Sequence, residues 1–332
     1  MKKKRSKSSS TKSSTRQIGT NQKNGSKPLQ STSPGRSGVS GIESKKTWTV
    51  SQRSRNVFRI DVEIERNHNW DFWALITSDR HWDSPKSNRE LQEKHLKQAI
   101  ERGAVTCDLG DALDLMGGKF DPRSYKGSVR SEHMVPNYFD AVVNDYAEWL
   151  QPYANSFAVM AQGNHETKMT EKHEFCPTER VVTLLNSRGA NVFNGAYAGW
   201  VQFNFKRRDG VTCREINLHY HHGHSSGKSA SNLSAQRERL RTHPDADVIV
   251  TGHAHNSWSD IAARYRISQN GQSYQDKVLL LGCPSYKDDT GCEDYGWAVE
   301  KGFEPKALGA WWIRFSYVRE TDSVTFQQIP AL

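Results

Sequence analysis

The sequence lacks the features that mark a membrane protein or a disulfide-stapled scaffold. It has five cysteines, an odd number, and no two of them form a C-x-x-C pair, so neither a disulfide framework nor a thiolate zinc site is expected. No apolar run approaches the ~18 residues of a membrane span, and no apolar segment follows the basic N-terminus as it would in a secretory signal. The simplest prediction is a protein of the reducing cytoplasm without membrane contact.

Large apolar side chains are also scarce, and the shortage is concentrated in residues 1–47, which consist mainly of Ser, Lys, Gly, Thr and Gln. This segment holds 12 of the 46 Lys and Arg residues and one of the 37 acidic residues, Glu43, which leaves 34 basic and 36 acidic residues elsewhere. The tail thus carries +11 and the rest of the chain −2. Such a tail cannot bury enough surface to offset the entropy of ordering. We therefore expect a disordered tail over 1–47 and one folded domain over 48–332.

Two kinds of role are compatible with the basic tail. Lys and Arg side chains that neutralise phosphates release counterions, so the tail could be an arm that contacts DNA or RNA, or a localisation address. A solubilising leader without a specific partner fits the same composition. Deletion of residues 1–47 should abolish DNA binding at low salt if the tail is such an arm.

From Thr47 onward, short apolar runs alternate with polar turns. Helices and strands alternate in the middle of the chain, and strands are more frequent towards both ends, which favours two packed sheets with helices outside them in one large α/β domain. The apolar patterns predict strands over 57–64, 72–77, 105–109, 157–161, 216–222, 247–251, 277–282, 310–318 and 323–328, and helices over 88–103, 137–150, 177–187 and 229–242.

Polar clusters follow the predicted strands at the points where they end. Ligands of α/β folds bind beyond the carboxyl ends of strands, so these clusters are expected to meet at one rim. The glycines before Asp111, Asn164 and His253 permit sharp turns and close backbone approach. The clusters are Asp79-Arg80-His81, Gly110-Asp111-Ala112-Leu113-Asp114, Gly163-Asn164-His165-Glu166, His222-Gly223 and Gly252-His253-Ala254-His255.

The donor atoms in these clusters are those of a metal site. Carboxylate, imidazole and amide oxygen together suit Mn²⁺, Fe or Zn²⁺. Seven ligands are too many for one catalytic ion with open positions, and they fit two ions that share a carboxylate about 3.5–4 Å apart. The candidate ligands are Asp79, His81, Asp111, Asn164, His222, His253 and His255.

The five clusters, in this order, resemble the calcineurin-like metallophosphoesterase superfamily, whose pattern is D-x-H, G-D-x-x-D, G-N-H-D/E, H-G and G-H-x-H. The resemblance covers roughly residues 70–256. It implies a four-layer α/β/β/α sandwich with two mixed sheets. The layout of Gly163–Thr167 and of the insertion that begins at Gly117 is most similar to members encoded by bacteriophages, which would place the protein in the host cytoplasm.

The resemblance also implies a role for each residue. Asp79, His81 and His255 would bind the first metal, while Asn164, His222 and His253 would bind the second, and Asp111 would bridge them. A hydroxide between the metals would attack phosphorus. His165 would act as general acid towards the leaving oxygen, and the carboxylate of Asp114 would hold the ring of His165 in the required tautomer.

The assignment of His222 needs a choice among neighbours, because residues 219–224 contain four histidines. The family pattern places the ligand directly before the glycine, which selects His222. His219 and His221 should point to the opposite face of a regular strand. His224 would lie just beyond the ligand and could face the substrate.

Two more residues are candidates for substrate contact. Lys228 lies in a glycine- and serine-rich segment that almost spells a phosphate-binding loop, although His222 occupies the position of its first glycine. Arg80 lies between two ligands of the first cluster. The segment 117–130 carries further basic residues and could cover the metals or be a solvated loop.

We therefore predict a hydrolase that uses two divalent ions, with Mn²⁺ as the first choice and Fe or Zn²⁺ as alternatives, to cleave phosphodiesters of nucleic acids or nucleotides. The first cluster lacks the flanking glycines of Ser/Thr protein phosphatases, which argues against that class. A phosphomonoesterase for proteins or small molecules remains an alternative. A non-catalytic alternative is a nucleic-acid-binding or scaffold protein that acts through the basic tail. The sequence does not indicate an oligomeric state.

Overall fold

The computed structural model describes residues 47–332, except 68, 118–125, 225–228, 292–296 and 303. All the described residues belong to one compact unit. The prediction about the basic tail, residues 1–47, falls almost entirely outside the described residues and stays a prediction. Within the described residues, no helix is long and apolar enough to span a membrane.

One sheet has six strands in the order β13-β12-β3-β4-β5-β6. Its strands β3, β4, β5 and β6 run parallel to one another, while β12 pairs antiparallel with both β3 and β13. The sheet is therefore mixed. Its strands are β3 (Asp71–Thr77), β4 (Val105–Asp108), β5 (Phe157–Met160), β6 (Phe193–Asn194), β12 (Ala310–Val318) and β13 (Ser323–Ala331).

The other sheet has seven strands in the order β1-β2-β7-β8-β9-β11-β10. The pairs β2–β7, β8–β9 and β9–β11 are parallel, and the remaining pairs are antiparallel. This sheet is mixed as well. Its strands are β1 (Trp48–Ser54), β2 (Val57–Glu63), β7 (Ala198–Lys206), β8 (Thr212–His221), β9 (Val248–Thr251), β10 (Trp258–Ile267) and β11 (Ser273–Gly282).

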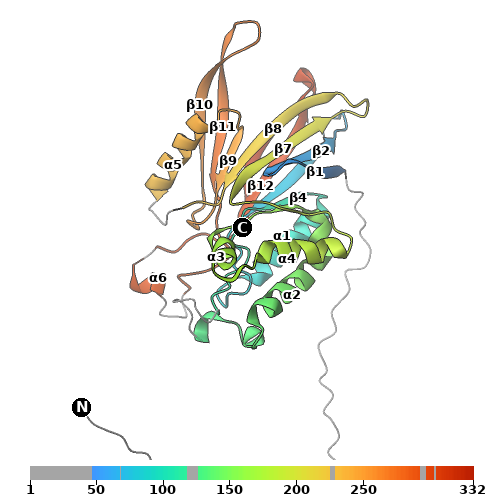
Figure 1. Cartoon of the computed structure of the whole chain (residues 1–332). Coiled ribbons are helices and arrows are strands. Elements are labelled where there is room, and N and C mark those ends of the chain that lie inside the picture. The colour runs from blue at the N-terminus through green and yellow to red at the C-terminus, as the bar shows by residue number, and fades with distance from the viewer. Residues whose placement is uncertain (1–46, 68, 118–125, 225–228, 292–296, 303) are drawn as a thin grey trace, which may run out of the picture. The chain divides into compact units, whose positions relative to one another are not determined.

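The two sheets pack face to face with helices on both outer sides (Figure 1). The largest apolar core draws on inward-facing residues of both sheets, such as Ile76, Phe203 and Phe315. A second core lies between the six-stranded sheet and helices α1 (Arg89–Glu101), α2 (Tyr138–Leu150) and α4 (Pro177–Ser187). A small third core, which includes Leu240 of α5 (Ser229–Thr242), lies on the outer face of the seven-stranded sheet. The predicted four-layer α/β/β/α sandwich is confirmed.

Local sequence signals explain the helix ends. The side chain of Asn88 accepts a hydrogen bond from the Leu91 amide and caps α1, and Gly103 follows this helix with a positive φ of 60°. Pro177 occupies the first turn of α4, where a missing N–H costs nothing. The remaining short helices are α3 (Asn164–His173), α6 (Trp297–Glu300), η1 (Lys126–Ser128), η2 (Ser131–His133), η3 (Gln151–Ser156) and η4 (Arg319–Thr321).

Several elements were not predicted from the sequence. Strand β7 carries polar residues on its outer face, and β10 is a sheet edge with exposed apolar side chains such as Ile261 and Tyr265. Helix α3 is almost entirely polar. These segments take their structure from their neighbours in the fold, since tertiary pairing overrides weak local patterns.

Candidate metal centre

The polar clusters meet where strands β3, β4, β5, β8 and β9 end, and backbone hydrogen bonds tie their loops together. The amides of Asp79 and His81 donate to the carbonyls of Gly110 and Asp111, at 2.9 and 3.0 Å. The amide of His253 donates to Asp79 Oδ2 at 2.9 Å. The first cluster is therefore bonded to both the second and the fifth.

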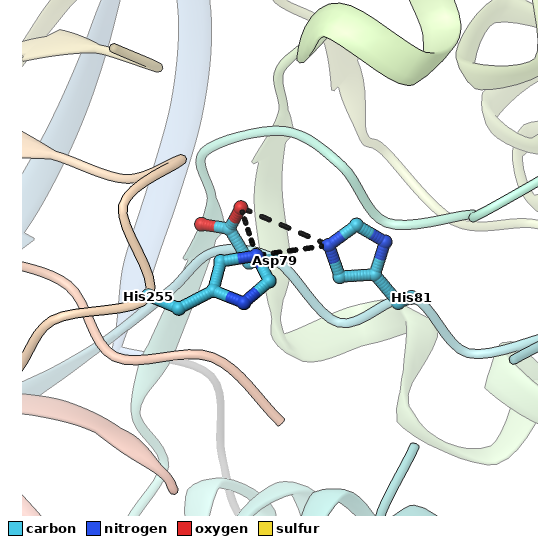
Figure 2. A group of neighbouring side chains, drawn as sticks. All are labelled: Asp79, His81 and His255. Atoms are coloured by element: carbon cyan, nitrogen blue, oxygen red, sulfur yellow. Dashed lines mark hydrogen bonds and ion pairs between the residues drawn. The ribbon is translucent and has the colours of Figure 1, made fainter. Parts of the chain in front are cut away.

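Six of the seven candidate ligands fall into groups whose donor atoms lie within 4.8 Å of one another. Asp79, His81 and His255 form one group (Figure 2). Asp111, His222 and His253 form another. The first group is the set that the resemblance implies for a first ion, and the second combines the implied bridge, Asp111, with two of the three residues implied for a second ion. Such groups could hold metal ions. Asn164, the remaining candidate, begins α3 beside His165.

The two groups are linked through Asp111. Its Oδ2 lies 3.0 Å from His222 Nε2, and its Oδ1 accepts a hydrogen bond of 2.9 Å from the amide of His165. Asp111 also forms a third group with His81 and His165. Asp111 therefore lies beside residues of both groups, and its bridging role stays a prediction.

The ligand loops have strained backbones. Five of the seven candidate ligands have a positive φ between 42° and 66°, although none of them is glycine. A non-glycine residue in this left-handed region costs on the order of 1–3 kcal/mol, and such residues concentrate at functional sites. The five residues are Asp79, His81, Asp111, His253 and His255.

The glycines of the clusters serve mainly to let the loops approach one another. A Cβ on Gly163 would lie 2.1 Å from Asp111 Oδ1, and a Cβ on Gly252 would lie 2.7 Å from Asp79 Oδ2. Neither glycine has a positive φ. At Gly110 both the backbone conformation and the lack of space favour glycine. Its φ is 104°, and a Cβ there would lie 2.5 Å from the Gly163 amide nitrogen.

Hydrogen bonds at Nδ1 orient the rings of His222 and His255, and a carboxylate lies close to Nδ1 of His81. His222 Nδ1 donates to the Leu109 carbonyl at 3.0 Å, and His255 Nδ1 to Asp289 Oδ2 at 3.1 Å. His81 Nδ1 lies 3.0 Å from Asp114 Oδ1. With Nδ1 of His222 and His255 occupied in this way, Nε2 of these two rings is free to bind a metal.

The arrangement of these Nε2 atoms fits a metal ion. Asp79 Oδ1 is buried and lies 3.3 Å from Nε2 of His255 and 3.9 Å from Nε2 of both His81 and His222, yet it has no hydrogen-bond partner among the described residues. The buried Oδ1 of Asn164 also lacks a partner in the described part of the chain. Buried polar atoms are normally paired, and a cation between these oxygen and nitrogen donors would satisfy them.

Acids and histidines of the site shift each other's pKa values strongly. Burial alone would raise the pKa of Asp79, but His222 and His255 hold it well below its ordinary value. Burial would lower the pKa of His222, but Asp111 and Asp79 raise it to about 10. The pKa of His255 is raised to about 9, because Asp79 and Asp289 outweigh burial. The buried carboxylates therefore favour the positively charged form of these two histidine rings.

Glu166 holds the second and third clusters together. Its carboxylate accepts hydrogen bonds from the amides of Asp111, Leu113 and Gly163, at 3.0, 3.2 and 2.8 Å. The side chain is 1% exposed. Glu166 thereby fixes the start of α3, and with it Asn164, relative to Asp111.

Asp114 orients His165, but through a different atom from the one predicted. His165 Nδ1 donates to the backbone carbonyl of Asp114 at 2.6 Å, while the nearer carboxylate oxygen is 3.5 Å away. The carboxylate instead contacts His81 Nδ1 and the ammonium of Lys287. Asp114 therefore serves both His165 and His81.

Arg80 does not contact the space around the candidate ligands, and the prediction that it touches substrate is wrong. Its side chain is fully buried. The guanidinium makes an ion pair with Asp108 and donates to Gln92 and Thr77. Asp79 and His81 lie on one side of this short segment, so the residue between them points to the other side, beneath the site.

The other candidates for substrate contact lie at the edge of the described residues. His224 is exposed, and its ring lies 6.3 Å from that of His221. Lys228 falls outside the described residues, so its predicted contact with phosphate stays untested, as does most of the basic segment 117–130.

A loop after β11 contributes residues that were not predicted. Ser285 Oγ donates to the Asp79 carbonyl at 2.8 Å, Lys287 Nζ lies 3.0 Å from Asp114, and Asp289 accepts from His255. The sequence did contain a signal. The apolar strand 277–282 ends in a polar cluster, as the five motif strands do, and β11 runs parallel to β9, so its carboxyl end reaches the same rim.

Comparisons with known proteins give weak likenesses only. No known family model matches the sequence, and no curated protein matches it. Two similar solved structures are a predicted phosphoesterase of Streptococcus pneumoniae (9% identity, TM-score 0.31, covering 79% of this chain and 98% of that one) and GAP50, the anchor in the inner membrane complex of Plasmodium (13%, TM-score 0.35, covering 79% and 85%). TM-scores this low support no conclusion about function. The resemblance to bacteriophage members stays a prediction from the motifs.

Proposed function

We propose that this protein is a two-metal phosphoester hydrolase that acts on phosphodiesters of nucleic acids or nucleotides. The observation that carries the proposal is the meeting of five separate loops around Asp111, with nitrogen and oxygen donors in two groups. Buried oxygens of Asp79 and Asn164 that lack partners among the described residues support the same conclusion. The +11 charge of residues 1–47 favours a polyanionic substrate.

We assign the ligands to two ions. Asp79, His81 and His255 would hold the first, Asn164, His222 and His253 the second, and Asp111 would contribute to both. Bound divalent ions lower the pKa of coordinated water and polarise the phosphoryl group. The nitrogen and oxygen donors suit Mn²⁺, which we propose as the activating ion.

His165 supplies the proton in this proposal. Its Nδ1–H is committed to the Asp114 carbonyl, so the proton for the leaving oxygen must be carried at Nε2. That atom lies on the Asp111 side of the ring, 3.9 Å from Oδ2. Burial lowers the pKa of His165, against the opposing effect of Asp111 and Asp114. A lowered pKa makes the imidazolium a stronger acid towards a leaving alkoxide.

The test compares hydrolysis of bis-p-nitrophenyl phosphate and p-nitrophenyl phosphate in the presence of Mn²⁺, for the wild type and for His222→Ala. We expect a preference for the diester and loss of activity in the variant. A preference for the monoester would support the phosphomonoesterase alternative. Absence of both activities in protein with bound metal would contradict the catalytic proposal for these substrate classes.

A further inference from the structure

The two groups of ligands differ in what stabilises their histidines. In the first site, both rings contact carboxylates at Nδ1, since His81 lies 3.0 Å from Asp114 and His255 lies 3.1 Å from Asp289. In the second site, His222 donates to a neutral backbone carbonyl, that of Leu109. The ligands that we assign to the two sites are therefore held in electrostatically different surroundings.

The direct ligands add to this difference. The first site has a carboxylate of its own, Asp79, in addition to a share of Asp111. The second site has the neutral amide of Asn164 in the corresponding place. Asp114 and Asp289 bring two further negative charges towards the first site. Lys287, which contacts Asp114 and Asp289, and Lys306, which donates to the Ala254 carbonyl, offset part of this charge.

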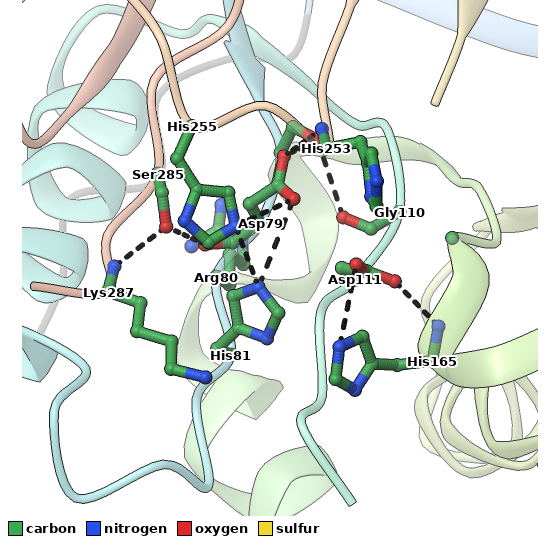
Figure 3. Close-up of polar contacts among 12 residues, drawn as sticks. Asp79, Arg80, His81, Gly110, Asp111, His165, His253, His255, Ser285 and Lys287 are labelled. Carbon is green, nitrogen blue, oxygen red and sulfur yellow. Dashed lines mark hydrogen bonds and ion pairs between the residues drawn. The ribbon is translucent and has the colours of Figure 1, made fainter. Parts of the chain in front are cut away.

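The loop that carries Asp289 is fixed in place. Ser285 Oγ donates to the Asp79 carbonyl and accepts from the Lys287 amide, both at 2.8 Å. The amide of Tyr286 also donates to the Asp79 carbonyl, at 3.1 Å. Figure 3 shows this loop with Ser285 and Lys287 beside Asp79 and His255. The loop is therefore bonded to a ligand residue through the backbone, and Asp289 extends from it to the ring of His255.

A carboxylate at Nδ1 has a defined effect on a histidine that binds metal through Nε2. It fixes the ring orientation and raises the basicity of the other nitrogen, and its loss typically weakens metal binding by about 10–100-fold. A backbone carbonyl fixes the orientation but brings no net charge. The contact between His255 and Asp289 should therefore strengthen the first site relative to the second.

We propose that Asp289 is a positioning residue that makes the first metal site the tighter of the two, so that one ion is retained when the other dissociates. This inference rests on the proposed two-metal function. It assigns a role to a loop outside the five motif clusters.

The experiment is a calorimetric titration of Mn²⁺ into the full-length chain after removal of metals with a chelator, at one fixed pH. The wild type should bind two ions with distinct affinities. Asp289→Asn keeps an acceptor oxygen of similar size but removes the charge. It should weaken the tighter ion by about 10–100-fold and leave the weaker ion unchanged.

Asp288→Asn is the matched control. Asp288 lies one residue earlier in the same loop, its carboxylate accepts from the amide of Thr290, and it undergoes the same change of charge. It should keep both wild-type affinities, and circular dichroism should show the same fold for both variants.

The outcomes separate the inference from the proposed function. Two equal sites in the wild type, unchanged affinities in Asp289→Asn, or an equal effect of Asp288→Asn would overturn the role of Asp289 while leaving a two-metal enzyme in place. A wild-type protein that binds no metal would overturn the proposed function and the inference with it.

Discussion

Two polar clusters of this protein both contain aspartates, but the surroundings satisfy these carboxylates differently. The surface cluster, formed by Arg59, Asp61, Asn204 and Lys206 on β2 and β7, surrounds its acid with donors. Asp61 Oδ1 accepts from Arg59 at 3.0 Å, from Lys206 at 2.9 Å and from Asn204 at 2.5 Å. The Asp61 side chain is 26% exposed, so water can complete its shell.

The second cluster, which we call the rim cluster, holds its charged groups away from water. We use this name for Asp79, His81, Asp111, His222 and His255. Their side chains are between 0% and 14% exposed, and the acids face histidines rather than Lys or Arg. Four of the five have a left-handed backbone, and Asp79 Oδ1 has no hydrogen-bond partner among the described residues.

This difference separates a cluster that stabilises the fold from one that is arranged to bind. The surface cluster is complete without any ligand. The rim cluster retains strain and an unpaired buried oxygen, which persist only where the surrounding structure enforces them. Backbone strain and an unpaired buried oxygen lower the stability of the fold at the rim cluster, but they leave groups there that can bind a cation.

Removal of His165, which lies beside the rim cluster and is not assigned to metal, should have the largest effect. We expect His165→Gln to reduce turnover by about 10²–10⁴-fold, because it removes the proton donor to the leaving oxygen. Metal content, measured by mass spectrometry, should stay at the wild-type level. The loss should be greatest for substrates with poor leaving groups, and an equal loss for good and poor ones would rule out the general-acid role.

Metal should stabilise the rim cluster and leave the surface cluster unaffected. At an Mn²⁺ concentration about 100 times the Kd, each occupied site adds about 2.7 kcal/mol to the free energy of unfolding. The melting temperature should therefore rise on adding Mn²⁺ and fall with a chelator. We expect Asp111→Asn to lose this response and Asp61→Asn to keep it. A response that persists in Asp111→Asn would exclude the bridging role.

The buried ion pair beneath the rim cluster should contribute more to the free energy of unfolding than the ion pair in the surface cluster. Arg80 and Asp108 are both fully buried, so Arg80→Met leaves an uncompensated buried carboxylate and should lower the free energy of unfolding by about 3–5 kcal/mol. The matched variant Arg59→Met removes a partly exposed partner of Asp61 and should cost about 1 kcal/mol or less. Urea denaturation measures both, and equal costs would contradict the distinction.

A methyl group placed between two rim loops should disturb the site without changing any charge. The φ of Gly163 is −105°, which alanine adopts freely, but a Cβ there would lie 2.1 Å from Asp111 Oδ1. Gly163→Ala should therefore cost about 1–3 kcal/mol through overpacking and weaken Mn²⁺ binding in calorimetry. Gly103→Ala, at a position with no neighbour within 4 Å, should keep wild-type Mn²⁺ binding.

The sequence predicted much of the rim because of one regularity. Parallel strands end at a common edge, so polar residues that directly follow apolar runs are brought together whatever their distance in the chain. This places Asp79 near Asp111 at the edge of the six-stranded sheet, and His222 near His253 at the edge of the seven-stranded sheet. Two packed sheets with helices outside them also follow from the apolar patterns, whereas the mixed strand directions were expected only from the family resemblance.

The sequence did not reveal which atoms of the predicted residues make the contacts, or in which direction some side chains point. The choice of Asp114 between its carbonyl and its carboxylate depends on the left-handed turns nearby, which local patterns do not indicate. Arg80 was assigned to substrate because its neighbours are candidate ligands, although alternation along the chain points it the other way. Asp289 acts on His255 from a loop 34 residues further along the chain, a pairing that only the fold establishes.

The smallest expected effect comes from the surface cluster and depends on pH. Burial alone would raise the pKa of Asp61, but hydrogen bonds from Lys206, Asn204 and Arg59 lower it from 3.8 to about 2. The folded state therefore favours the ionised carboxylate, so its stabilisation is present above pH 4 and is lost as the pH falls through 2. Solvent screening of this partly exposed group limits the contribution to about 1 kcal/mol.

Asp61→Asn should therefore be less stable than the wild type by about 1 kcal/mol at pH 7, and by about half as much at pH 3. Urea denaturation at both pH values, with a chelator present throughout, measures this difference without a contribution from bound metal. A difference that grows as the pH falls would mean that Asp61 is destabilised by its surroundings. The donors around Asp61 would then fail to stabilise its charge, and the contrast between a satisfied surface cluster and an unsatisfied rim cluster would fail.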